Sequence, residues 1–313
     1  MQKRELGRSG LAIAPLVLGG NVFGWTADRT RSFELLDHFV DGGFNAIDTA
    51  DVYSAWAPGL SGGESETVIG EWLAARKRRD DIVLMTKVGM WETQKGLSAA
   101  NIEAALHGSL KRLNTDHVDV YFAHLDDQDV PLEETLGAFS RLIEAGKVRA
   151  IGASNYGAER LGRALQISGS QNLPRYEVVQ PAYNLYDRAE FESNLAPVIE
   201  AEGLGAVSYF SLASGFLTGK YRTKADLEGS RRKDFLANYF DGRGIRILDA
   251  LREVADDVGA PASQVALAWL QGRPALTAPI ASATSLDQLN EIMGAAQLTL
   301  PAAACAKLDA AST

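Results

Sequence analysis

The chain is organised around Phe44-Asn45-Ala46-Ile47-Asp48-Thr49-Ala50-Asp51-Val52-Tyr53. The first half of this stretch is apolar and of strand length, and the second half brings two carboxylates and a phenol. An apolar strand that runs into a polar loop at its C-terminal end is typical of a barrel strand that carries chemistry. Later strands end in Lys87 and His124, which are the other groups that a proton-transfer site needs.

Apolar runs of strand length alternate with helical periodicity, which indicates βα units and a parallel sheet. The predicted strands are 16–18, 45–48, 82–86, 118–122, 149–153, 177–180, 204–209 and 276–280, with helices between them at 30–41, 64–76, 98–112, 132–145, 157–168 and 190–202. Six strands end in Asp48, Lys87, His124, Ser154, Gln180 and Tyr209. These positions are 39, 37, 30, 26 and 29 residues apart, which is the pace of a repeated βα unit.

The pattern predicts an α/β fold, a (β/α)8 TIM barrel, with residues 1–313 as a single domain. Two short runs, 4–6 and 11–13, flank a glycine-rich turn and predict an N-terminal β-hairpin. Extra helices are expected after the seventh strand and at the C-terminus. The insertion after the seventh strand begins with a polar loop at 219–243, and helices follow at 245–258 and from 261. Two further helices are expected at 285–296 and 301–310. No G-x-G-x-x-G follows the first strand, which favours a closed barrel over an open nucleotide-binding sheet.

The composition argues against several classes of partner. A net charge of −9 disfavours nucleic acid or an anionic membrane, because both select basic surfaces. No apolar stretch reaches the ~18 residues of a membrane span. The single cysteine, Cys305, allows no internal disulfide and fits a reducing compartment, so we expect a cytoplasmic protein.

Four residues near the strand ends fit a proton-transfer site. A tyrosine has a free pKa near ~10, so Tyr53 needs a neighbouring cation before it exchanges protons at neutral pH. Lys87 can be that cation, Asp48 can hold it charged, and His124 can hydrogen-bond a substrate oxygen. Each residue alone is more often a turn, rim or core residue. Four compatible types at successive strand ends favour the catalytic interpretation.

At these residues the sequence resembles the aldo-keto reductase family. The matching motifs are 48–53, 85–89, 110–113, 121–124, 146–155, 180–184 and 212–221, and the resemblance covers about residues 4–300. The family's tetrad falls on Asp48, Tyr53, Lys87 and His124 without substitution. The resemblance implies an oxidoreductase that transfers a hydride from NADPH to an aldehyde or ketone, or reversibly oxidises an alcohol, with Tyr53 as the general acid and base.

The resemblance also implies which residues bind the nicotinamide cofactor. The carboxamide would lie against Ser154, Asn155 and Gln180, and the ring would stack on Tyr209. A loop of small residues would let backbone amides approach the pyrophosphate, and a lysine would add charge. That loop contributes Ser211, Leu212, Ser214, Gly215, Leu217, Gly219 and Lys220. The remaining expected contacts are Gly20, Asn21, Asp48, Ile280, Ser282, Thr284, Gln288 and Glu291.

NADP(H) is the expected cofactor, with NAD(H) as the alternative. Many relatives place an arginine for the 2′-phosphate soon after the last barrel strand, but residues 281–288 contain none. Arg231 and Arg232, in the long insertion, lie where some relatives have a phosphate-binding cation. Solvated loop charges are the competing interpretation of these two arginines.

Aromatic residues in the loops after the strands predict a pocket for an apolar or bulky carbonyl compound. They are Trp25, Trp56 and Trp91, with Phe235, Tyr239 and Phe240 of the insertion. Ordinary packing of loop aromatics is the alternative interpretation.

The same motifs leave other functions open. A nicotinamide-binding regulatory protein with low turnover, similar to the potassium-channel β subunits, shares this fold and several motifs. A Schiff-base aldolase that uses Lys87 is less favoured, because Asp48 would keep that lysine protonated. The histidines lack ligand spacing, so no metal is expected. The expected partner is a small-molecule carbonyl compound, and the oligomeric state stays open.

Overall fold

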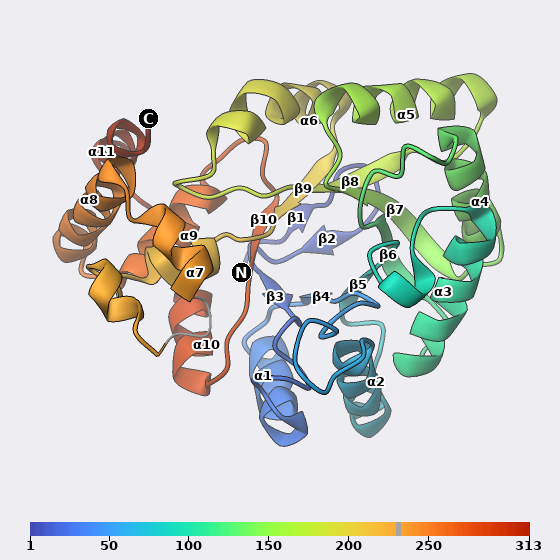
Figure 1. The fold of residues 1–313 in the computed structure, drawn as a ribbon, viewed down its shortest axis with the longest axis horizontal. Helices are drawn as coiled ribbons and strands as arrows, with labels where there is room; N and C mark the ends of the chain where they lie inside the picture. Colours follow the sequence, from blue (N-terminus) through green and yellow to red (C-terminus); the bar gives the residue numbers. More distant parts are fainter. Residues whose placement is uncertain (230–232) are drawn as a thin grey trace.

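The computed structural model describes residues 1–229 and 233–313, and its centre is a closed barrel of parallel strands (Figure 1). Around the ring the strands are β10 (Ala278–Ala281), β3 (Val17–Gly19), β4 (Ala46–Asp48), β5 (Val83–Val88), β6 (Val118–Ala123), β7 (Val148–Ser154), β8 (Tyr176–Gln180) and β9 (Gly205–Ser208). β10 closes the ring by pairing with both β3 and β9. The predicted (β/α)8 barrel is confirmed.

The helices surround the barrel, and the predicted helices are present with small shifts at their ends, except that the segment 190–202 divides into a π-helical turn, Phe191–Leu195, and the shorter helix α6 (Figure 1). They are α1 (Arg29–Asp41), α2 (Glu64–Arg76), α3 (Ala99–Arg112), α4 (Leu132–Glu144), α5 (Ala158–Gln171), α6 (Ala196–Glu202), α9 (Ala262–Gln271) and α10 (Leu286–Gly294). Side-chain caps begin several of them; for example, Asp28 and Ser98 accept from the backbone N–H three residues later. In the described ranges, no helix is both long and apolar enough to cross a membrane.

The N-terminal hairpin joins the core inside the barrel. β1 (Arg4–Glu5) pairs antiparallel with β2 (Ala12–Ile13), as predicted. Leu6, Leu11 and Ile13 of this segment belong to one buried cluster with inward-facing residues of the barrel strands. Asn45, just before β4, fixes the hairpin, because its side chain accepts from Ala14 N (2.9 Å) and donates to the Ala12 carbonyl (3.0 Å).

The insertion after β9 is more ordered than the predicted polar loop. It contains 3-10 turns at Lys224–Leu227 and Ala237–Tyr239 and the short helix α7 (Lys233–Leu236). α8 (Gly242–Val258) begins three residues before its predicted start, because the Asp241 side chain caps it at Gly244 N (2.7 Å). The expectation of an irregular loop was wrong because Leu227, Leu236, Tyr239 and Phe240 are buried, and this packing orders the segment. The C-terminal helix α11 (Ala302–Ser312) contacts α8.

Gly70 provides a test of the packing between α2 and the end of α3. A Cβ atom at Gly70 would lie 2.0 Å from the Arg112 carbonyl oxygen. We expect Gly70→Ala to lower the free energy of unfolding by ~1–3 kcal/mol, because the backbones must move apart. Gly162→Ala on α5, where a Cβ would meet nothing within 4 Å, should be neutral or raise it by up to ~1 kcal/mol. Urea unfolding measures both, and equal effects would contradict the close approach.

Candidate active site

The centre of the site is the ammonium group of Lys87, which is fully buried at the end of β5. Lys87 Nζ donates to Asp48 Oδ2 at 2.7 Å, to the Thr49 carbonyl at 2.7 Å and to Tyr53 Oη at 3.0 Å. The parallel register of β4 and β5 brings these strand ends together. The structure therefore joins three of the four predicted tetrad residues directly. The Thr49 carbonyl is a partner that the sequence did not signal.

Burial and charge decide the protonation of this cluster. Burial alone would lower the pKa of Lys87, but the Asp48 carboxylate and Tyr53 outweigh it and raise that pKa above its usual range. Burial also raises the pKa of Tyr53, against the opposing effect of Lys87. At neutral pH the site therefore holds an ammonium group and a protonated phenol, which can act as a proton donor.

His124 follows β6 and faces Tyr53, with 6.2 Å between the ring centroids. Its side chain is largely buried, and Nδ1 has no hydrogen-bond partner among the described residues. Burial and the charge of Lys87 hold the pKa of His124 well below its usual range. The imidazole is thus neutral at neutral pH, which suits a hydrogen-bond donor to a substrate oxygen better than a proton source.

Gln180, at the end of β8, reaches the same cluster from another part of the barrel. Its side-chain Nε2 donates to Asp48 Oδ1 at 2.8 Å. Its backbone carbonyl accepts from Ser154 Oγ at 2.9 Å, so these two predicted carboxamide residues lie side by side. The sequence placed Gln180 at a strand end but gave no signal for the contact with Asp48.

Asn155 and Tyr209 form a second link around the mouth. Asn155 Nδ2 donates to the His124 carbonyl at 2.7 Å, and Tyr209 Oη donates to Asn155 Oδ1 at 2.7 Å. The predicted stacking ring of Tyr209 is therefore tied to the strand end that carries His124. Asn155 has a φ of 59°, a left-handed conformation that asparagine tolerates better than most residues.

The loop after β9 turns tightly, with positive φ at Phe210, Ala213, Ser214 and Gly215. Consecutive turns of this kind can expose backbone N–H groups to an anion, but the N–H groups of Ala213, Gly215 and Leu217 already donate to carbonyls within the loop. A Cβ atom at Gly215 would lie 3.5 Å from Lys220 Nζ, so the loop backbone and a cation lie close together. This arrangement fits the expected pyrophosphate.

Several predicted loop residues can contribute only their backbone. Ser211 Oγ donates to the Ser208 carbonyl at 2.9 Å, and the Leu217 side chain is fully buried. Leu212 is partly buried against the core, and Gly219 packs close to Ala262 on α9. Side-chain contacts from Ser211 or Leu217 to a cofactor are therefore not available in this conformation.

The remaining predicted cofactor residues lie on neighbouring strand ends. Gly20 N donates to the Asp48 carbonyl (2.7 Å), and Ser282 Oγ donates to Asn21 Oδ1 (2.5 Å), which joins the ends of β3 and β10. Ile280 on β10 belongs to the buried cluster inside the barrel.

The expected adenosine side contains no described cation after β10. Thr284 donates through N (2.9 Å) and Oγ1 (3.0 Å) to Gln288 Oε1, and Ser263 Oγ donates to Glu291. Residues 281–291 include no lysine or arginine. Arg231 and Arg232, which were expected to meet a 2′-phosphate, lie outside the described residues.

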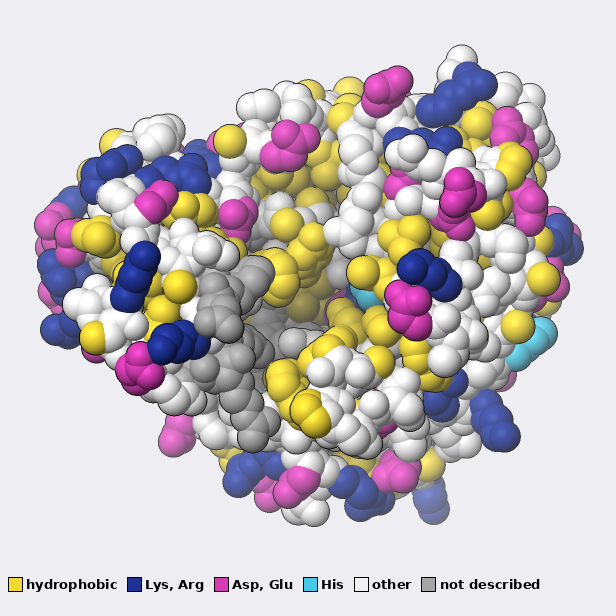
Figure 2. Space-filling model, viewed as in Figure 1, with side chains coloured by type: hydrophobic (Ala, Val, Ile, Leu, Met, Phe, Trp, Pro, Cys, Tyr) yellow, Lys and Arg dark blue, Asp and Glu magenta, His cyan; other side chains and the backbone are white. Residues whose placement is uncertain are grey.

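Two of the three predicted pocket tryptophans form one aromatic cluster with Tyr53. Trp56 packs edge-on against Tyr53 (5.4 Å between centroids) and against Trp25 (5.9 Å), and it is 49% exposed. Figure 2 shows a hollow in the centre of the molecule, with hydrophobic side chains around it and a histidine visible inside. Trp91 lies apart from this cluster: its indole donates to the Ser61 carbonyl (2.9 Å) and faces Arg112.

The expectation for the aromatic residues of the insertion was wrong in two cases. Tyr239 and Phe240 are buried against Phe216, with centroid distances of 5.2 and 5.1 Å. The Tyr239 hydroxyl donates to Asp187 Oδ2 at 2.8 Å. These side chains hold the insertion together because they supply its own small core. The Phe235 side chain is outside the described part of the chain.

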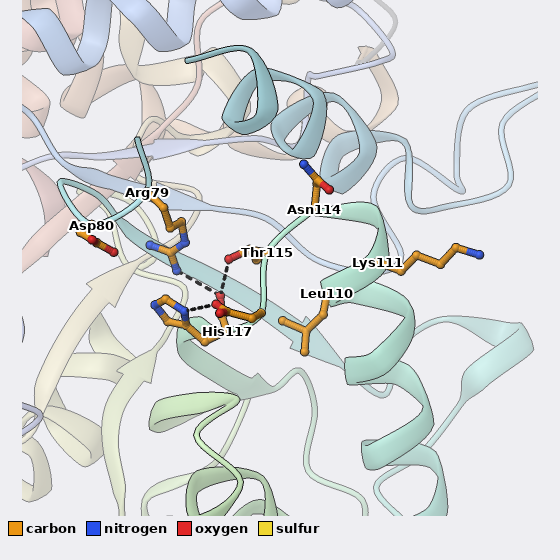
Figure 3. A pocket seen from close by; sticks show the side chains of 8 residues that line it. Arg79, Asp80, Leu110, Lys111, Asn114, Thr115 and His117 are labelled. Atoms are coloured by element: carbon orange, nitrogen blue, oxygen red, sulfur yellow. Dashed lines mark hydrogen bonds and ion pairs between the residues drawn. The ribbon is translucent and has the colours of Figure 1, made fainter. Parts of the chain in front are cut away.

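A second hollow, of about 730 Å³, lies where α3 ends and β6 begins, away from the tetrad (Figure 3). The Arg79 guanidinium in this hollow donates to the His117 carbonyl (3.2 Å) and to Asp119 Oδ2 (2.7 Å). Lys111 points away from Arg79 (Figure 3). The charged groups do not converge on a common point, so this hollow does not resemble a binding site.

Asp51 is a second carboxyl beside the tetrad, and it is fully buried. Neither of its oxygens has a hydrogen-bond partner among the described residues. Burial and nearby Glu66 raise the pKa of Asp51 to about 7. Glu66 itself is held by Arg112 (2.7 Å) and Thr86 (2.5 Å). Asp51 is therefore largely protonated below pH 7.

Asp51 should make stability fall with rising pH. The folded state keeps the proton up to about pH 7, whereas the unfolded state loses it near the ordinary pKa of 3.8. Between these values the unfolded state binds fewer protons, so wild type loses up to about 4 kcal/mol of unfolding free energy relative to Asp51→Asn. Urea unfolding at pH 5 and pH 8 measures the part of this loss that falls between those values, about 3 kcal/mol. The exposed Asp80→Asn is the control, and a pH-independent gap between wild type and Asp51→Asn would contradict the assignment.

Comparison with known proteins identifies the family of the chain. The model of the aldo/keto reductase family matches residues 15–313. The uncharacterized oxidoreductase YrpG of Bacillus subtilis is 33% identical, covering 96% of this chain and 92% of its own length. A probable voltage-gated potassium channel subunit beta of Oryza sativa subsp. japonica is 34% identical (94% and 91%), and protein tas of Escherichia coli is 32% identical (99% and 97%). The chain belongs to the aldo/keto reductase family.

Proposed function

We propose that the protein is an oxidoreductase that transfers a hydride from NADPH to an aldehyde or ketone, and that can run in reverse as an alcohol oxidation. The observation that carries this proposal is the buried hydrogen-bonded chain from Asp48 through Lys87 to Tyr53, with a neutral His124 beside it. Family membership and the printed name of the Bacillus subtilis relative support the same reaction class.

The residues divide the proton chemistry between them. Tyr53 gives its proton to the carbonyl oxygen as negative charge develops there. The ammonium of Lys87, 3.0 Å from Tyr53 Oη, stabilises the phenolate that remains, and Asp48 keeps that ammonium charged. The neutral imidazole of His124 donates a hydrogen bond to the same substrate oxygen. Because Lys87 stays charged, it is a poor nucleophile, which argues against the Schiff-base alternative.

The nicotinamide cofactor, when bound, supplies the hydride. Gln180, Ser154 and Asn155 would hold its carboxamide, and Tyr209 would offer a flat face to the ring. The loop 211–220 would receive the pyrophosphate through its backbone and Lys220. The unpaired Nδ1 atom of buried His124 and the cluster of positive φ angles in that loop support the fit of these residues to a ligand.

The substrate proposal rests on the exposed aromatic rim. Trp56 lies beside Tyr53 and Trp25 lies beside Trp56, so a carbonyl carbon near Tyr53 would bring its substituents close to an indole surface. Flat or bulky apolar carbonyl compounds gain most from such a surface.

Removing the phenolic hydroxyl tests the acid assignment. We expect Tyr53→Phe to lower kcat by ~10²- to 10⁴-fold, because the general acid is lost while the ring remains. NADPH affinity, followed by fluorescence titration, should change little. Tyr156→Phe is the control, since among the described residues its hydroxyl meets only Tyr176 (3.2 Å), away from the tetrad. Wild-type kcat in Tyr53→Phe would refute the role.

Cofactor preference can be tested at the two arginines of the insertion. We expect Arg231→Ala combined with Arg232→Ala to weaken NADPH by about tenfold or more and NADH much less, because only NADPH carries the 2′-phosphate. Arg246→Ala, at an exposed position of α8, is the matched control. Equal weakening of both cofactors would remove these arginines from the phosphate site. Faster turnover with NADH in wild type would assign Thr284 to an NADH-preferring site.

A regulatory protein with low turnover is the second candidate, because a relative of similar identity is named as a probable potassium channel subunit beta. Loss of reduced-nicotinamide absorbance against a panel of aromatic and aliphatic aldehydes and ketones separates the two. The enzyme proposal expects clear turnover with at least one compound. Tight NADPH binding without turnover of any compound would favour the regulatory function.

A further inference from the structure

Gln180 makes a contact that a cofactor-binding role alone does not require. β4 and β8 lie four positions apart in a ring of eight strands, so they stand on opposite sides of the barrel. Gln180 nevertheless reaches across the mouth to Asp48, with 2.8 Å between Nε2 and Oδ1. Both side chains are about 98% buried. Backbone pairing does not impose this bond, because the two strands are not neighbours.

The contact gives the second carboxylate oxygen of Asp48 a hydrogen-bond donor. One carboxylate oxygen accepts from Lys87 and the other accepts from Gln180. Because a carboxylate is only an acceptor, it fixes the orientation of the Gln180 amide, with the NH₂ group toward Asp48. Gln180 Oε1 is then directed away from Asp48, and it accepts no hydrogen bond from the described residues.

We propose that Gln180 is a positioning residue that connects the cofactor carboxamide to the tetrad through Asp48. Its Oε1 receives an N–H of the carboxamide, and its Nε2 holds Asp48 against Lys87. The chain of hydrogen bonds then runs from the carboxamide through Gln180, Asp48 and Lys87 to Tyr53. Cofactor binding and proton donation are thereby coupled. This inference rests on the proposed function for its catalytic half, but its binding half can be measured without turnover.

The binding half is tested by a double-mutant cycle between Gln180 and Asp48, with NADPH affinity as the readout. In Asp48→Asn, the new amide still accepts from Lys87 but presents NH₂ to Gln180, so the Gln180 amide must flip and offer NH₂ to the carboxamide. We expect this variant to weaken NADPH about fivefold, although Asp48 does not itself meet the carboxamide.

The same substitution should have little effect when the amide is absent. Gln180→Met, which is similar in length and lacks both polar atoms, should weaken NADPH by about fivefold or more, and Asp48→Asn should add almost nothing to it. If the fold-losses of NADPH affinity from the two single substitutions multiply in the double variant, the two residues act separately and the inference is overturned.

The catalytic half is tested by the pH profile of kcat at saturating NADPH. Gln180→Glu keeps the shape and the cofactor-facing acceptor but turns an oxygen toward Asp48. The added negative charge should move the alkaline limb of kcat, which reports the Tyr53 proton, to higher pH by about one unit. Gln180→Met adds no charge and should instead lower kcat about tenfold with a smaller displacement of the limb.

The outcomes separate the inference from the proposed function. If wild type turns over but Gln180→Glu changes only NADPH affinity, with the limb at its wild-type pH, the inference fails and the oxidoreductase proposal stands. If wild type binds NADPH without turning over any carbonyl compound, the proposed function fails, and the double-mutant cycle alone decides whether Gln180 and Asp48 are coupled.

Discussion

The rest of the site depends on the buried ion pair between Lys87 and Asp48. Both side chains are removed from solvent, and an unpaired charge in that position would cost several kcal/mol. The fold meets this cost with a full set of acceptors for the ammonium group and two donors for the carboxylate. Truncating either side chain should therefore cost about 3–5 kcal/mol of stability, whereas Asp48→Asn keeps the size of the side chain and an acceptor for Lys87. The pair places the positive charge of Lys87 beside the phenol of Tyr53, which explains why the site contains buried charges despite their energetic cost.

The barrel explains how residues from distant parts of the chain reach this pair. Parallel strands direct their C-terminal ends to one mouth, so each strand end delivers one polar group to a common volume. Neighbouring strands give the Asp48 to Lys87 contact, and opposite strands give the Asp48 to Gln180 contact. The hairpin fills the interior with Leu6, Leu11 and Ile13, which leaves the mouth for polar chemistry. The polar groups of the site thus lie above an apolar interior and are shielded from solvent, where electrostatic interactions are strong.

Sequence reasoning succeeded where a short-range signal exists. Alternating periodicities predicted all eight strands and the hairpin, and residue types at strand ends predicted that Asp48, Tyr53 and Lys87 would meet. It failed where tertiary packing decides. Tyr239 and Phe240 were expected in a pocket because they are aromatic loop residues, but Phe216 lies beside them and gives them a core. The reach of Gln180 across the barrel depends on which way one amide turns, and no spacing in the chain encodes that orientation.

Asp48 and Asp51, the two aspartates of the stretch 44–53, lie three residues apart but have different surroundings. Asp48, at the end of β4, accepts hydrogen bonds from Lys87 and Gln180. Asp51, three residues later, is equally buried, but among the described residues no side chain donates to it, and Glu66 is nearby. Burial and Glu66 therefore raise the pKa of Asp51 to about 7, against the smaller opposing effect of the Val52 backbone N–H. Sites that move protons often hold two groups of the same type in surroundings that give them different pKa values, because one group can then be charged while the other stays neutral.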